Sequence, residues 1–474
     1  MLFSEPVFLF AFFPLVLLVY FIPLRGMRKA QNFFLLLASL FFYGWGEPRF
    51  VLVMILSIAM NYRFGLWFHQ CRRQCRYMGR PIAAAVTCNL VILFIFKYLT
   101  FTLTSLNQLG LGLTVPLIEL PIGISFFTFQ AMSYVLDVAM GKTEVQRSPL
   151  ALGLYISFFP QLIAGPIVKY TTVAHEIEGR VENWADFSYG CTRFLTGLGK
   201  KVLLANQMAV IADRVFSTDP ADLSTPMAWL GSLCYTFQIY YDFSGYSDMA
   251  IGLGRMFGFH FLENFDHPYA AKTITEFWRR WHISLSTWFR DYLYIPLGGN
   301  RNGKGTHLRN LLVVWLLTGL WHGADWTFVA WGLFYFLFAA LESFTRFNDR
   351  WPVVFQRLYT LLVVDLLWML FRSETLEYAW GFFLTMLGFQ GTGPVDPMAG
   401  LYFSENAVFL ALALLFSFPV APWLRKKLES IHTSPVDISA LFDALYALGL
   451  VAVGVICTCY LVKGTYNPFI YFRF

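Results

Sequence analysis

The chain contains 474 residues, of which 57% are hydrophobic and only 14% are charged, and its mean hydropathy is +0.55. These values exclude an ordinary soluble globular protein and indicate an all-α polytopic membrane protein. The formal net charge of +6 is compatible with nucleic-acid binding or with anchoring of cytoplasmic loops. Because the basic residues lie in segments between apolar runs, we favour anchoring among membrane lipids and expect no nucleic-acid partner.

Three apolar segments occupy the first part of the chain, at residues 7–24, 33–45 and 51–68. A bilayer core of about 30 Å needs about 20 helical residues, so the first and third segments are long enough to cross it. Basic residues follow both segments and therefore share one side of the membrane, namely Arg25, Arg28, Lys29, Arg72, Arg73, Arg76 and Arg80. The positive-inside rule makes this side cytoplasmic and turns the N-terminus outward. No basic stretch precedes the first segment, so we expect it to be retained rather than cleaved as a signal peptide.

The next apolar segments, 84–96 and 120–138, are separated by a long connection with few charges. The second contains PIGISFFTFQAMSYVLD, whose small and polar residues allow helices to pack closely and to hydrogen-bond with one another. Residues 152–167 end in FFPQLIAGPIV, and the prolines and glycine predict a broken or re-entrant helix. Such backbone persists at membrane depth only where protein buries it or a cavity hydrates it, so we expect a cavity here.

The middle of the chain is more polar. Residues 168–183 are expected to form a soluble loop, and residues 191–216, interrupted by Lys200 and Lys201, predict an interfacial or amphipathic helix. HEIEG lacks the second histidine of H-E-x-x-H, and the seven cysteines show no C-x-x-C pairing, so we expect neither a metal site nor a disulfide framework. Three glycines in residues 252–258 miss the spacing of the dinucleotide fingerprint G-x-G-x-x-G.

Residues 275–301, TEFWRRWHISLSTWFRDYLYIPLGGNR, interleave arginines with aromatic residues. This pattern is typical of helices that lie at the level of the lipid headgroups. Arginines also bind phosphate groups through bidentate hydrogen bonds, so this stretch could receive a phosphate-bearing substrate from the cytoplasm. Headgroup anchoring explains most of these arginines equally well, and both interpretations stay open.

The stretch TGLWHGADWTFVAWG places His322 between tryptophans within an apolar run, in which Asp325 is the only other side chain able to carry charge. A helix that begins near Arg309 would carry His322 about 20 Å into the membrane. Gly323 is the natural point for that helix to end. Histidine titrates near neutrality and can serve as a general base, although a hydrogen bond across a helix pair is the alternative role.

Several of these strings together resemble the membrane-bound O-acyltransferase family, in the branch that includes the transmembrane subunit of alginate O-acetyltransferase and relatives acting on other bacterial polysaccharides. The strings are PIGISFFTFQ, FPQLIAGPI, YYDFSGYSDMAIGLG, ITEFWRRWHISLSTWFRDYLYIPLGGNR, GLWHGADWTFVAWG and NPFIYFRF. The resemblance implies about 11 transmembrane helices with re-entrant and interfacial helices around a central channel. We expect a single domain over residues 1–474, with N-terminal helices at 1–110, a catalytic core at 111–345 and C-terminal helices with an aromatic tail at 346–474.

The resemblance also implies a chemistry. Acetyl-CoA would donate acetyl groups on the cytoplasmic side of the bacterial inner membrane, with His322 as general base and His282 at the family's second characteristic position. The acceptor would be an extracytoplasmic polysaccharide, alginate-type or alternatively peptidoglycan or cellulose. A periplasmic partner of the serine-hydrolase type would reach it, since this chain has no G-x-S-x-G elbow. The residues expected to contact the donor are Arg279, Arg280, Trp281, Arg290, Asn300 and Arg301.

Tyr471, in the terminal string NPFIYFRF, resembles the tyrosine of an aromatic motif proposed to carry the acyl group transiently. A phenol needs a base to become a nucleophile, and His322 could supply it. The alternative is an aromatic residue of the membrane interface, because tyrosine and phenylalanine residues surround it.

At the level of the whole chain, a transporter or flippase for a sugar or lipid intermediate is a second hypothesis, but it predicts internal repeats that the sequence does not display.

Overall fold

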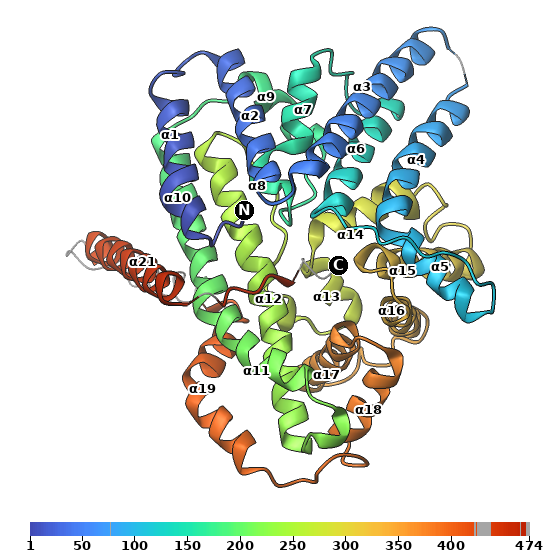
Figure 1. Ribbon diagram of the computed structural model, residues 1–474, viewed down its shortest axis with the longest axis vertical. Coiled ribbons are helices and arrows are strands. Elements are labelled where there is room, and N and C mark those ends of the chain that lie inside the picture. The colour runs from blue at the N-terminus through green and yellow to red at the C-terminus, as the bar shows by residue number, and fades with distance from the viewer. Residues whose placement is uncertain (76, 421–422, 424–437, 465, 471–474) are drawn as a thin grey trace. The chain divides into compact units, whose positions relative to one another are not determined.

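The computed structural model describes residues 1–75, 77–420, 423, 438–464 and 466–470, and none of these residues lies in a β-strand (Figure 1). The chain divides into two compact units. Unit 1 consists of Met1–Phe194, Ser247–Glu263 and Thr287–Tyr292. Unit 2 consists of Leu195–Tyr246, Asn264–Ser286 and Leu293–Phe474.

Unit 1 is built mainly from the N-terminal helices, and α2 packs against α7 while α3 packs against α6. Its helices are η1 (Phe8–Phe12), α1 (Phe13–Phe21), α2 (Arg28–Gly46), η2 (Pro48–Phe50), α3 (Val51–Arg73), α4 (Gly79–Leu93), η3 (Phe94–Tyr98), α5 (Leu99–Gln108), α6 (Ile124–Ala139), α7 (Pro149–Ser157), α8 (Phe159–Leu162), α9 (Tyr170–Gly179) and most of α10 (Trp184–Gly199). The break predicted within residues 152–167 is confirmed, because the backbone leaves the helical conformation at Phe158, between α7 and α8.

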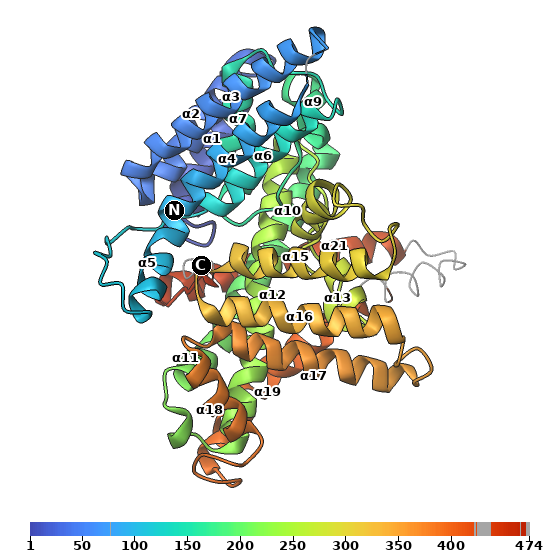
Figure 2. The ribbon, with the colours of Figure 1, turned by 90° about the vertical axis from the view of Figure 1, so that its right-hand side faces the viewer.

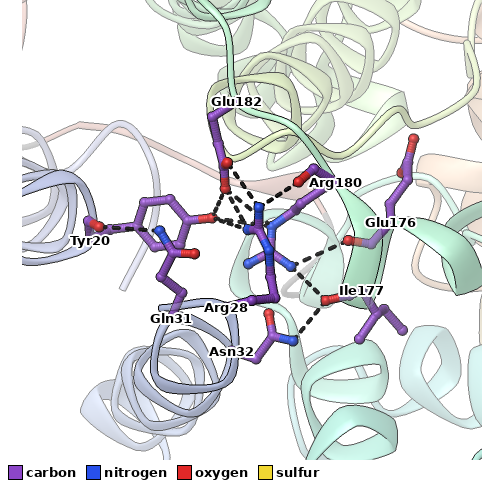
Figure 3. A network of polar contacts seen from close by, with 8 residues as sticks. All are labelled: Tyr20, Arg28, Gln31, Asn32, Glu176, Ile177, Arg180 and Glu182. Carbon is purple, nitrogen blue, oxygen red and sulfur yellow. Dashed lines mark hydrogen bonds and ion pairs between the residues drawn. The ribbon is translucent and has the colours of Figure 1, made fainter. Parts of the chain in front are cut away.

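A polar network joins the start of α2 to the segment that follows α9 (Figure 3). Arg28 forms an ion pair with Glu182 at 2.5 Å, and the Tyr20 hydroxyl donates to the same carboxylate. The buried Arg180 guanidinium donates to the Tyr20 hydroxyl at 3.1 Å and to the Ile177 carbonyl at 2.9 Å. The prediction of a simple soluble loop is therefore wrong for this stretch, which contains a helix with one buried face whose charged neighbours are paired within the unit.

Unit 2 contains most of the C-terminal half of the chain. Its helices are η4 (Lys200–Ala205), α11 (Asn206–Phe216), η5 (Pro220–Asp222), η6 (Pro268–Ala270), α13 (Ile274–Arg280), α15 (Lys304–His322), α16 (Trp326–Thr345), α17 (Val353–Arg372), α18 (Leu376–Met386), α19 (Pro397–Phe416) and α21 (Ile438–Lys463). Three further elements contribute residues to both units, namely α12 (Thr225–Met256), α14 (Ile283–Phe289) and η7 (Arg290–Tyr294). The helix continues through Lys200 and Lys201 as a π-helical turn, so these lysines do not end it.

The described part of the chain contains six helices that are long and apolar enough to cross a membrane, which makes this a multi-pass membrane protein. They are Pro48–Arg73, Gly79–Gln108, Trp326–Thr345, Val353–Arg372, Pro397–Phe416 and Ala444–Lys463. Phe8–Phe21 and Ile124–Ala139 are shorter apolar helices. The predicted total of about 11 spans stays a prediction.

Helices α15, α16 and α17 lie side by side in unit 2 (Figure 2). The first two approach closely through glycines: a Cβ atom on Gly319 would lie 2.4 Å from the Phe328 carbonyl oxygen, and one on Gly332 would lie 2.5 Å from that of Trp315. Helix α15 ends at His322, and Asp325 caps α16 by accepting from the Thr327 amide at 3.1 Å. The predicted end of the helix at Gly323 is confirmed.

Candidate active site

His322 is the last residue of α15, and aromatic rings surround its imidazole. The ring centroid lies 5.0 Å from that of Trp321, 5.1 Å from that of Trp331 and 5.3 Å from that of Phe371, each in an edge-to-face arrangement. Only 3% of the residue is exposed. Because these rings belong to α15, α16 and α17, the packing of three helices fixes the position of the imidazole.

His282 lies in the bend between α13 and α14, outside the six candidate spans, and is completely buried. Its φ angle of +44° is in the left-handed region, which is uncommon for a non-glycine residue. The Phe243 ring packs edge-to-face with the imidazole at a centroid distance of 4.7 Å. Burial lowers the pKa of His282 to about 3, so this imidazole is neutral at physiological pH.

Asn264 determines which nitrogen of His282 carries the proton. The Ser284 amide donates to Asn264 Oδ1 at 3.1 Å and the Ser284 hydroxyl donates at 2.9 Å, which identifies this atom as the amide oxygen. His282 Nδ1 lies 3.3 Å from the same oxygen and must donate to it. The tautomer protonated at Nδ1 follows, and Nε2 keeps its lone pair.

The structure brings the two histidines together although 40 positions separate them in the sequence. Their ring centroids are 6.5 Å apart. Trp321 contacts both rings, at 5.7 Å from His282 and 5.0 Å from His322. The arrangement places two imidazoles in a water-poor, aromatic environment, where a base and a hydrogen-bonding group can act on one substrate.

Glu342 positions the helix that leads into His282. This buried residue of α16 accepts from the Ile274 amide at 2.7 Å and from the Thr275 amide at 2.9 Å, so its carboxylate caps the N-terminus of α13. Neither Glu342 nor Asn264 belongs to a motif that the sequence displays. Each contacts a segment distant in the sequence, and no local motif marks such a contact.

The residues expected to contact the donor have different environments. Arg279 is exposed, whereas Arg280 is paired with Glu276 at 2.9 Å. Trp281 is only 1% exposed, and its ring packs 4.8 Å from that of Trp368. Contact with a donor stays a prediction for all three.

The remaining expected residues lie elsewhere in the chain. Arg290 belongs to unit 1 and makes an ion pair with Asp291 at 2.7 Å. Asn300 and Arg301 are exposed in the turn before α15, in unit 2. Tyr471 lies outside the described residues. Among the residues that the structure describes, no group of three or more His, Cys, Asp or Glu side chains could hold a metal ion.

Comparison with known proteins identifies the class. The chain belongs to the membrane-bound O-acyltransferase family, whose family model matches residues 144–374, and it is therefore a membrane O-acyltransferase. It is similar to the probable alginate O-acetylase AlgI of Azotobacter vinelandii, with 38% identity over 508 residues and 100% of both chains covered. The probable alginate O-acetylase AlgI of Pseudomonas putida is 39% identical over 503 residues, again with 100% of both covered. The peptidoglycan O-acetyltransferase of Helicobacter pylori is 38% identical over 429 residues, covering 82% of this chain and 80% of the relative.

Proposed function

We propose that this protein transfers acetyl groups from cytoplasmic acetyl-CoA across the membrane for O-acetylation of an extracytoplasmic polysaccharide. An alginate-type exopolysaccharide is favoured, because relatives similar over the whole chain carry the name alginate O-acetylase. Peptidoglycan is the second candidate acceptor, supported by the name of the Helicobacter pylori relative. The proposal places the protein in the bacterial inner membrane with its N-terminus outward, together with a periplasmic partner of the serine-hydrolase type.

The buried pair of His282 and His322 carries this proposal. In the proposed step His322 removes the proton of an acceptor hydroxyl, and the hydroxyl oxygen attacks the carbonyl carbon of the thioester. The carbon–sulfur bond breaks, and the proton passes from His322 to the departing thiolate of CoA. General base catalysis of this kind contributes about 10²- to 10⁴-fold to a rate.

The other residues have supporting roles in the proposal. In the proposal, the exposed residues Arg279, Asn300 and Arg301 of unit 2 bind the phosphates of the donor. Arg290 belongs to unit 1 and is paired with Asp291, and its contact with the donor stays a prediction. Trp281, being buried, would act by holding the end of α13 in place. Tyr471 is a candidate transient carrier of the acetyl group, with a place in the aromatic membrane interface as the alternative.

The test is to replace His322 by Ala in a strain that contains the native partners and to measure polymer-bound acetate together with exported polymer. We expect acetate to be lost and export to continue. His307→Ala is the matched control, because His307 lies on the same helix but near its cytoplasmic start, where it contacts Tyr294 and Phe344. Unchanged acetylation in His322→Ala would overturn the proposed function, whereas lost export with normal acetylation would support a transporter.

A further inference from the structure

Unit 2 contains a buried ion pair that involves neither of the two histidines. Lys201, in the π-helical turn η4, places its Nζ 2.6 Å from Oδ1 of Asp242 on α12. The two side chains are only 4% and 1% exposed. Burying two charges costs more free energy than their attraction returns unless further hydrogen bonds satisfy them, so a pair of this kind contributes little as a stabilising element alone.

The further hydrogen bonds of this pair go to the backbone of the C-terminal segment, residues 466–470. Lys201 Nζ donates to the Pro468 carbonyl, and Asp242 Oδ2 accepts from the Ile470 amide at 2.9 Å. The two backbone groups flank Phe469, one on each side. The ion pair thus offers one donor and one acceptor to an extended chain, much as a neighbouring β-strand would.

Side-chain contacts fix the register of the same segment. The Tyr466 hydroxyl donates to Asp213 at 2.5 Å, and Asn206 donates to Asn467 at 3.2 Å. The partners of the segment are thus Asp213 for Tyr466, Asn206 for Asn467 and Lys201 for Pro468. The residue number of the partner falls as that of the segment rises, so the segment runs antiparallel to η4 and α11. The Phe469 ring packs against Tyr246 with centroids 5.1 Å apart. Figure 1 shows this segment, in red, crossing α12 after α21.

We propose that Lys201 and Asp242 are positioning residues that seat the C-terminal segment, and that acetyl transfer requires the segment to be seated. The functional half of this inference rests on the proposed function. Ile470, whose amide donates to Asp242, directly precedes Tyr471 in the sequence. Seating would act on the transfer step and not on binding of the donor.

The decisive variant exchanges the two charges, Lys201→Asp with Asp242→Lys. It keeps an ion pair, so the core gains no isolated charge. The exchanged pair cannot bind the C-terminal segment. An aspartate at position 201 has no proton to donate to the Pro468 carbonyl, and a lysine at position 242 cannot accept from the Ile470 amide. A second double variant, Lys201→Met with Asp242→Leu, removes both charges and covers the case in which the exchanged pair fails to fold. Lys201→Arg, which keeps the cation and its donors, is the conservative variant.

Binding of the C-terminal segment is measured by crosslinking. The native cysteines are replaced, Asn206→Cys and Asn467→Cys are introduced, and a short bifunctional thiol reagent joins the two new cysteines. We expect efficient crosslinking with the natural ion pair, and a drop of about 10-fold or more with either double variant. In inverted membrane vesicles that contain the native partners, we expect kcat for acetyl transfer to fall about 10- to 100-fold while KM for acetyl-CoA changes less than about 2-fold. Lys201→Arg should keep most of the crosslinking yield and most of kcat.

Undiminished crosslinking in both double variants would overturn the inference. So would unchanged kcat in a variant that has lost crosslinking, provided that His322→Ala abolishes transfer in the same vesicles. If His322→Ala leaves transfer intact, the proposed function fails instead, and the crosslinking yield alone decides whether Lys201 and Asp242 seat the segment.

Discussion

Different groups surround the two histidines of the site. His282 is held at Nδ1 by Asn264, and its backbone has the left-handed conformation, so its imidazole has a fixed tautomer and orientation. The rings of Trp321, Trp331 and Phe371 pack edge-to-face with the His322 imidazole and fix the plane of its ring. In the proposed mechanism His322 gains and loses the proton, and His282, whose pKa burial lowers to about 3, is a neutral neighbour.

The pH dependence of transfer follows from the low pKa of His282. A group whose pKa is lowered to about 3 is already deprotonated between about pH 5 and 8, so it contributes no titration in that range. We expect His282→Gln to lower the rate of acetyl transfer. In a plot of kcat against pH, the pH at which kcat falls to half on the acid side should stay unchanged. If kcat of His282→Gln no longer fell on the acid side, His282 would be the base that titrates.

Among the elements, α13 is the one whose position decides the distance between the histidines. It is only seven residues long, and a helix this short has little stability of its own. The carboxylate of Glu342 ties its first two amides to α16, the helix that also contributes Trp331 to the surroundings of His322. The capping contact therefore joins the two halves of the site.

Glu342→Gln tests this contact. The amide keeps one acceptor oxygen and loses the charge, so we expect unfolding to become easier by about 1.5–3 kcal/mol and kcat to fall. The measurement is thermal unfolding in detergent together with the acetyl-transfer rate. Glu377→Gln is the matched control, because Glu377 lies exposed in the first turn of α18, and its replacement should change neither quantity beyond experimental error. Equal effects of the two variants would argue against a special role for Glu342.

On the scale of the whole molecule, the positive-inside rule predicts an orientation that Cys75 can report. This exposed thiol follows α3 in a basic loop that we assign to the cytoplasm. Leu111→Cys would place a thiol in the loop after α5, one apolar helical segment further along the chain and hence outside. We expect a membrane-impermeant maleimide to label Leu111→Cys in intact spheroplasts, and to label Cys75 only after permeabilisation. Labelling of Cys75 in intact spheroplasts would reverse the assigned orientation.

Much of the architecture could be predicted from the sequence, because apolar run lengths and the glycine and proline positions are local signals. The helix break at Gly323 and the broken segment around Phe158 are examples. Two contacts could not be predicted from the sequence: the contact of His282 with Asn264, and the hydrogen bond from Lys201 to the C-terminal segment. They depend on groups 18 and 267 positions apart, and only the folded chain brings such groups together.

The most direct test of the account measures acetyl transfer from labelled acetyl-CoA in inverted membrane vesicles that contain the native partners. We predict that His322→Ala lowers the rate by about 10²-fold or more at equal protein level, and that His307→Ala does not. Added imidazole should restore part of the lost rate by acting as a base in the space that the side chain vacates. A His322→Ala rate within about 2-fold of the unmodified protein would contradict the account, because general base catalysis by His322 could not then contribute the expected factor.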